Sequence, residues 1–168
     1  LPAEGETAMN ILHICSYYGG SKLYTELNHA LQRAELSSTF YVPTQASQES
    51  RLAEENVKES VCFTGFDRYF FHWKHYKILK DLYAHLPVTE YSLVHAHSLF
   101  SNGYIAYRLK KAHNLPYITA VRNTDVNTFF KKMPHLRGLG VDILRNASAV
   151  VFLSAAYRDA LLAQYIPA

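Results

Sequence analysis

The sequence contains little cysteine and no long apolar segment, and both absences limit the class of protein. Its 168 residues include two cysteines, Cys15 and Cys62, which fall in separate expected strands and do not form a CxxC pair. We therefore expect reduced, buried thiols and not a disulfide scaffold. No apolar run approaches the ~18 residues that a membrane-spanning helix requires. These features predict a cytoplasmic protein.

An excess of charge of one sign is also missing. The chain carries 17 Lys and Arg residues against 14 Asp and Glu residues, a net charge of +3. This balance is too weak to predict nucleic-acid binding, although it suits an anionic ligand or a membrane surface. The basic segment that we expect to contact the inner face of an anionic membrane comprises Lys131, Lys132, His135, Arg137 and Arg145. An ordinary solvated face is the alternative interpretation of these residues.

The common nucleotide-binding fingerprints are absent. A dinucleotide fold requires GxGxxG after its first strand and an acidic residue at the end of its second. Here Gly19 and Gly20 are adjacent, and the second expected strand ends at Pro43. A P-loop requires GxxxxGK[ST], and Gly20-Ser21-Lys22 does not fit that order. The first turn is therefore expected to form neither a dinucleotide-binding site nor a P-loop.

What the sequence does contain is a regular alternation of apolar runs and helical stripes. Strands are expected at 10–18, 39–42, 61–63, 92–97, 117–121 and 149–153, with helices between most of them. Ser21 is a candidate N-cap and Asn114 a candidate helix end. This alternation predicts an α/β fold, a Rossmann-like doubly wound, mostly parallel sheet with helices on both faces.

The domain organisation follows from the same pattern. Residues 1–8 lack any pattern and precede Met9, so we expect them to be an addition to the native chain, and residues 9–168 to form one domain. A short helix is expected at 51–55 and a long one at 67–86. The long helix is expected to present a solvated basic face and a core-facing side made of Phe70, Phe71, Trp73, Lys74, Ile78, Leu82 and Leu86. A nucleic-acid-binding or membrane-binding stripe is the alternative interpretation of its aromatic and basic residues.

Candidate site residues follow the expected strands, because ligands of open parallel sheets bind at the carboxyl ends of the strands. Glycine allows a sharp turn and a close approach of ligand to backbone N–H groups, although Gly19-Gly20 also fits a plain turn. The candidate substrate-binding residues are Tyr18, Gly19, Gly20, His97, Ser98, Asn102 and Asn123.

Arg122 and Asp125 are the candidate catalytic residues. Arg122 offers planar donors to an anion, and Asp125 offers acceptors to sugar hydroxyls. A local ion pair between the two is the alternative. No Ser-His-Asp or Cys-His set can be assembled from the sequence.

His95 and His97 lie two residues apart on a strand and so share one face. Such a pair can chelate a metal, but no third ligand stands at a suitable spacing, so we expect no metal site. His95 is expected to be a packed histidine, as is His13 of the first strand, whereas His97 lies at the end of its strand and is the better functional candidate.

Three segments in this order resemble the N-terminal domain of retaining glycosyltransferases of family 4, which have the GT-B fold. They are 9–20, from MNIL to Gly19-Gly20; 93–103, from LVHAHS to Gly103; and AVVFLS at 149–154. The resemblance covers residues 9–167. In that family the pattern His-Gly-Thr-Asp follows a strand, and its histidine contacts the donor sugar. The matching residues here are Arg122-Asn123-Thr124-Asp125, so Arg122 stands in place of the histidine.

The resemblance implies a two-domain enzyme that transfers a sugar from a nucleotide donor with retained configuration. The N-terminal domain binds the acceptor, here a polysaccharide or glycolipid, and a C-terminal domain absent from this chain binds the donor. No cofactor beyond the donor is implied, and the isolated domain is expected to be inactive. Two alternatives remain: a non-catalytic binding or scaffold subunit that needs a catalytic partner, and half of a GT-B sugar-nucleotide epimerase.

Overall fold

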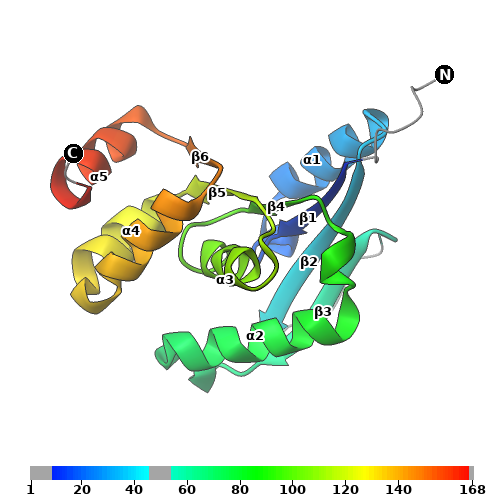
Figure 1. The fold of residues 1–168 in the computed structure, drawn as a ribbon, viewed down its shortest axis with the longest axis horizontal. Helices are drawn as coiled ribbons and strands as arrows, with labels where there is room; N and C mark the ends of the chain where they lie inside the picture. Colours follow the sequence, from blue (N-terminus) through cyan, green and yellow to red (C-terminus); the bar gives the residue numbers. More distant parts are fainter. Residues whose placement is uncertain (1–8, 46–53, 167–168) are drawn as a thin grey trace.

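The computed structural model describes residues 9–45 and 54–166 and contains one six-stranded parallel sheet. The strand order is β3-β2-β1-β4-β5-β6 (Figure 1). The strands are β1 (Asn10–Ile14), β2 (Ser37–Gln45), β3 (Val57–Phe63), β4 (Leu93–Ala96), β5 (Tyr117–Val121) and β6 (Ala149–Phe152). All neighbouring pairs are parallel, so the predicted fold class is confirmed.

The helices cover both faces of this sheet (Figure 1). Along the strand order, the chain proceeds across the sheet in one direction from β1 to β2, and in the opposite direction from β3 to β4, β5 and β6. Because parallel crossovers are right-handed, the two directions place helices on opposite faces. Accordingly α1 (Lys22–Arg33) covers one face, and α2 (Phe71–His85), α3 (Gly103–His113) and α4 (Arg137–Asn146) cover the other. α5 (Ala155–Tyr165) follows β6.

Two apolar cores result, one on each face. Phe40 and Tyr41 alternate along β2: Phe40 belongs to the small core under α1, and Tyr41 to the large core under α2, α3 and α4. Leu82 and Ile105 are fully buried in the large core. Within the described residues, no helix combines the length and the apolar character needed to cross a bilayer.

Local signals at two helix ends are confirmed. The Ser21 hydroxyl accepts a hydrogen bond from the N–H of Leu23, as an N-cap does. Asn114 ends α3 in the left-handed region at φ 55°, where asparagine is among the best tolerated residues.

The prediction that the second strand stops at Pro43 is wrong, because β2 continues to Gln45. The carbonyl of Tyr41 accepts a hydrogen bond from the N–H of Cys15 at the end of β1, so the backbone groups of Tyr41 point toward β1. Backbone groups alternate along a strand, so those of Val42 point toward β3 and those of Pro43 point toward the β1 side again, where β1 has already ended. Its missing N–H therefore costs no ladder hydrogen bond.

The long helix expected at 67–86 also needs correction. A 3₁₀ turn, η2 (Phe66–Tyr69), precedes α2, and the extended backbone of Phe70 separates them. The buried stripe of α2 consists of His75, Ile78, Leu79 and Leu82, so Phe70 and Trp73 are not core residues but 51% and 53% exposed. The short helix expected at 51–55 falls mostly outside the described residues.

Candidate functional site

The carboxyl edge of the sheet carries a hollow of about 590 Å³. It lies at the point where the strand order reverses, with β1 leading to one side of the sheet and β4 to the other. Ser16 and Tyr17 line it from the end of β1, Ser101 from the loop after β4, and Thr124 from the loop after β5. The remaining walls come from the ends of β2 and β3, η2, the start of α2 and the segment 128–136.

The lining of this hollow combines aromatic and cationic side chains. Phe71 and Phe129 form apolar walls with ring centroids 6.3 Å apart. Arg68, Lys74 and His135 supply basic groups, and no carboxylate lines the hollow among the described residues. Such a site suits a ligand with both apolar surface and negative charge.

Arg122 is held beside this hollow by two tyrosines. Its Nη1 donates a 2.7 Å hydrogen bond to the hydroxyl of Tyr24 from α1, and its guanidinium lies 4.7 Å from the ring centroid of Tyr17. The described structure contains no ion pair between the Arg122 guanidinium and Asp125, so the local ion-pair alternative is not what positions this side chain. Among the described residues, no carboxylate forms an ion pair with this guanidinium.

Asp125 performs a task that its sequence position did not suggest. Its carboxylate is 2% exposed and accepts three backbone N–H bonds: from Arg122 (2.9 Å) and Leu99 (3.1 Å) at Oδ2, and from Phe100 (3.1 Å) at Oδ1. Burial raises the pKa of Asp125, while these bonds and the Arg122 charge oppose that rise. In this geometry the side chain joins the loops after β4 and β5, and the role of Asp125 as an acceptor of sugar hydroxyls stays a prediction.

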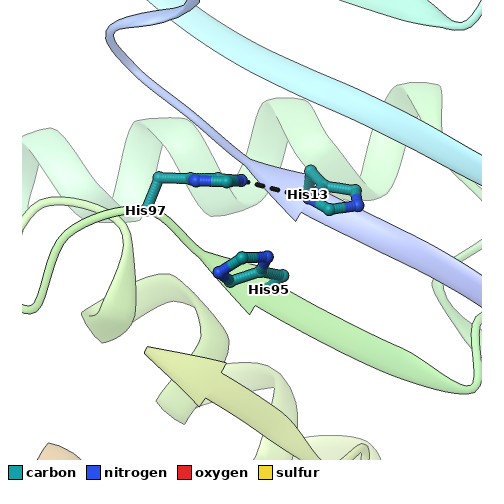
Figure 2. Close-up of side chains that lie close together, drawn as sticks. All are labelled: His13, His95 and His97. Atoms are coloured by element: carbon teal, nitrogen blue, oxygen red, sulfur yellow. Dashed lines mark hydrogen bonds between the residues drawn. The ribbon is translucent and has the colours of Figure 1, made fainter. Parts of the chain in front are cut away.

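Three histidines come together on the α1 side of the sheet (Figure 2). His13 of β1 stands in register with His95 of β4, and a 3.0 Å hydrogen bond joins His13 Nδ1 to His97 Nε2. Burial and the neighbouring imidazole of His95 lower the pKa of His13 to about 3. The same two causes, with His13 and Arg122 added, lower the pKa of His97 to about 2, so both rings are neutral near pH 7.

These imidazoles are the residues that could hold a metal ion, which corrects the expectation that no third ligand lies near His95 and His97. Their ligand nitrogens lie within 4.8 Å of one another. Two nitrogens that share Zn²⁺ at ~2.1 Å can be at most ~4.2 Å apart, a limit close to the spacing of these nitrogens. As they stand, the rings form a hydrogen-bonded stack: the His95 and His97 centroids are 4.2 Å apart, and His13 Nε2 lacks a partner.

A second polar network ties β1 to the start of α3. Asn102 is fully buried, and its Oδ1 accepts a 2.6 Å hydrogen bond from Ser16 Oγ at the rim of the hollow. Ser98 Oγ accepts from Asn102 N at 3.2 Å. Among the described residues, the Nδ2 donor of Asn102 has no partner. Ser98 and Asn102 are thus close to the site, but they act on Ser16 and on the loop backbone.

The other predicted binding residues are dispersed. Tyr18 is buried in the small core, where its hydroxyl bonds Glu54 and Asn28. Gly19 and Gly20 are exposed and, together with Tyr18, line a separate shallow hollow of about 270 Å³. Asn123 is exposed and its amide oxygen accepts from Asn127. The structure therefore does not bring Tyr18 and the glycines into one pocket with Arg122.

Several residues of the hollow were missed from the sequence. Tyr17 could have been chosen, because it lies in the segment between the first apolar run and the glycine pair, next to the selected Tyr18. Phe71 and Phe129 gave no such signal, since one belongs to a helical pattern and the other to a loop, and only packing brings them together.

A family model described as Glycosyltransferase Family 4 matches residues 17–168. The chain belongs to glycosyltransferase family 4. The match includes every lining residue of the hollow except Ser16, the histidine pair His95 and His97, and the Arg122 loop. None of the curated proteins compared with the chain matches it. Family membership confirms the resemblance and supports a function of the glycosyltransferase type.

Proposed function

We propose that this domain is the acceptor-binding half of a glycosyltransferase. In this proposal the enzyme transfers a sugar from a nucleotide-sugar donor to a polysaccharide or glycolipid acceptor, and the anomeric configuration is retained. The donor binds mainly to a second Rossmann-like domain, and no cofactor other than the donor takes part. The enzyme works in the cytoplasm at the inner face of the membrane.

The observation that carries the proposal is the 590 Å³ hollow at the reversal point of the sheet, with Arg122 beside it. This is the position where an open parallel sheet binds its ligand. The hollow has aromatic walls that fit a sugar ring or a lipid segment, and basic groups that fit a phosphate. Neither nucleotide fingerprint is present in the first turn, which favours an acceptor over a donor on this half.

Arg122 is the group that we assign to an anionic part of the substrates. A guanidinium stays charged at neutral pH, so it cannot serve as a general base, but it can bind phosphate or carboxylate oxygens. Tyr17 and Tyr24 already restrict the orientation of the guanidinium, so ligand binding costs less side-chain conformational entropy. Asp125 contributes indirectly by holding the loop that carries Arg122.

Calorimetric titration of the 168-residue chain tests the proposal. We expect it to bind phosphorylated or glycolipid acceptors and to bind nucleotide sugars far more weakly. We also expect Phe71→Ala and Tyr17→Ala to weaken acceptor binding, while Leu23→Ala, an exposed position on α1, leaves it unchanged. Tighter binding of nucleotide sugar than of acceptor, or sugar transfer by this chain alone, would contradict the assignment of acceptor and donor to separate halves.

A further inference from the structure

Exposed aromatic side chains are concentrated on one segment of the protein. Within the described residues, seven large aromatic side chains are exposed, and six of them lie between residues 66 and 83. These six side chains are between 45% and 83% exposed and are Phe66, Tyr69, Phe70, Trp73, Tyr76 and Tyr83. Monomeric soluble domains rarely expose such a contiguous patch unless it binds something.

The helical spacing places most of these rings on one stripe. Trp73, Tyr76 and Tyr83, with Lys80 between them, follow one another at intervals of three or four residues, so they share one face of α2. Ring contacts join the patch locally: the Trp73 and Tyr76 centroids are 5.7 Å apart. At the other end of the patch, the rings of Phe66 and Phe70 lie 5.4 Å apart.

The same region has a higher net positive charge than the chain as a whole. η2, α2 and α3 together contain seven Lys and Arg residues and two acidic residues, a balance of +5 in a chain whose total is +3. Both acids are engaged: Asp67 binds Lys77 at 2.8 Å, and Asp81 accepts a 2.6 Å hydrogen bond from Tyr41. The outer surface of this region is therefore strongly cationic.

A groove of about 580 Å³ between α2 and α3 collects three of these cations. Lys80 enters it from α2, and Arg108 and Lys111 enter from α3, with the rings of Tyr76 and Tyr83 as walls. In the described part of the chain, no carboxylate lies within ion-pair distance of the three cations. The groove thus offers several donors to an anionic group.

We infer that the outer face of η2, α2 and α3 docks on an anionic lipid bilayer. Tyr and Trp rings prefer the boundary between headgroups and acyl chains, and Lys and Arg bind anionic headgroups beside them. The groove of Lys80, Arg108 and Lys111 binds lipid phosphates. In the segment expected from sequence to contact the membrane, Arg137 donates to the Phe130 carbonyl at 2.6 Å and lies over Tyr165.

This surface leads directly to the acceptor hollow. Arg68, Tyr69 and Phe71 belong to the docking segment and also line the hollow. A glycolipid acceptor could therefore pass from the bilayer to the hollow without leaving the protein surface, a consequence that rests on the proposed function. The docking itself does not depend on it.

Trp73 provides a direct test, since it is the only tryptophan in the chain and is 53% exposed. We expect its emission to shift to the blue when phosphatidylcholine vesicles containing phosphatidylglycerol are added to the full chain, and to shift little with pure phosphatidylcholine. High salt should reverse much of the shift, because surface charges are screened. No shift with the anionic vesicles overturns the inference.

Matched double variants separate this face from general positive charge. Lys80→Ala with Lys111→Ala should lower vesicle partitioning about 30-fold, since each removed cation costs a factor of about 5 at an anionic surface. Lys131→Ala with Lys132→Ala removes the same charge from an exposed helical segment, and we expect a change of less than about 3-fold there. Equal losses in the two double variants overturn the inference.

An apolar pair and alternative partners complete the test. Phe66→Ala with Phe70→Ala should weaken partitioning, whereas Leu153→Ala with Leu162→Ala, also exposed, should not. A Trp73 shift caused by single-stranded oligonucleotide, by polysaccharide or by self-association, but not by anionic vesicles, overturns lipid as the partner. If vesicle binding fails while a water-soluble acceptor still binds the hollow, the docking surface is wrong and the proposed function stands.

Discussion

Removal of the Asp125 carboxylate distinguishes a positioning role from a catalytic one. Asp125→Ala would leave three backbone N–H groups, those of Leu99, Phe100 and Arg122, without their acceptor. Leaving a buried donor unpaired costs about 1–3 kcal/mol. The loss is partly offset because the carboxylate no longer has to be buried. We therefore expect a destabilisation of about 4 kcal/mol, a large part of the stability of a typical domain.

Asp125→Asn is the better variant for measurement, because its shape is nearly unchanged. Its amide oxygen can keep the two donors at the Oδ2 position, Leu99 and Arg122, while its NH₂ group faces the N–H of Phe100. One hydrogen bond becomes a donor–donor contact and the other two lose their charge assistance. We expect a destabilisation of about 2 kcal/mol. For a domain of this size, that corresponds to a melting temperature lower by about 6 °C.

Urea unfolding followed by circular dichroism measures these differences, with Asp142→Asn on the exposed surface of α4 as the control. The control should change stability by less than about 0.5 kcal/mol. In the complete enzyme, Asp125→Asn should lower activity mainly through the displaced Arg122 loop, with part of the activity kept. A variant that unfolds at the same urea concentration as the wild type but loses all sugar transfer would refute the positioning role.

Three further perturbations test other parts of the site. Arg122→Ala should lower kcat/KM in the complete enzyme about 10- to 100-fold, because the guanidinium that binds Tyr24 also binds the substrate anion. Arg122→Lys should recover part of this loss. Unchanged kinetics in Arg122→Ala would contradict this role. Gly20→Val should fold normally, since a Cβ there meets no atom within 4 Å, and activity retained in this variant would mean that the loop is only a turn. The pKa values of His13 and His97 are lowered from 6.5 in the folded protein, so below about pH 6.5 the unfolded chain binds more protons than the folded chain. The free energy of unfolding should therefore decrease as the pH is lowered, by up to about 1.4 kcal/mol per pH unit for each histidine. Equal urea midpoints near pH 7 and pH 5 would contradict the assignment.

The sequence alone determined the layers of this fold and the edge that carries the site. A strand buried on one face alternates apolar and polar residues, whereas the near-continuous apolar runs here indicated a sheet covered on both faces. All six expected strands are present. The ends of two helices were also encoded locally, at Ser21 and Asn114. Such features depend on periodicity and on the chemistry of a few neighbouring residues, so they can be read without knowing the contacts.

The partners of the site residues were decided by tertiary structure. Asp125 was correctly placed at the sheet edge, yet two of its three donors belong to Leu99 and Phe100, about 25 residues earlier. Similarly, His13 completes the histidine cluster from a neighbouring strand, in register with His95. The spacing of residues along the sequence does not show which side chains pack against one another in the folded protein.

The orientation of α2 is the clearest case of a decision made by packing. Its sequence has apolar and aromatic residues on more than one side, so periodicity allowed an inward face containing Phe70 and Trp73. The break at Phe70 and the contacts of Ile78 and Leu82 with the sheet instead turned His75 and Leu79 inward and Trp73 outward. A helix can bury only one stripe against a flat sheet, and which stripe is buried depends on the shape of the partner surface, which the sequence of the helix does not contain.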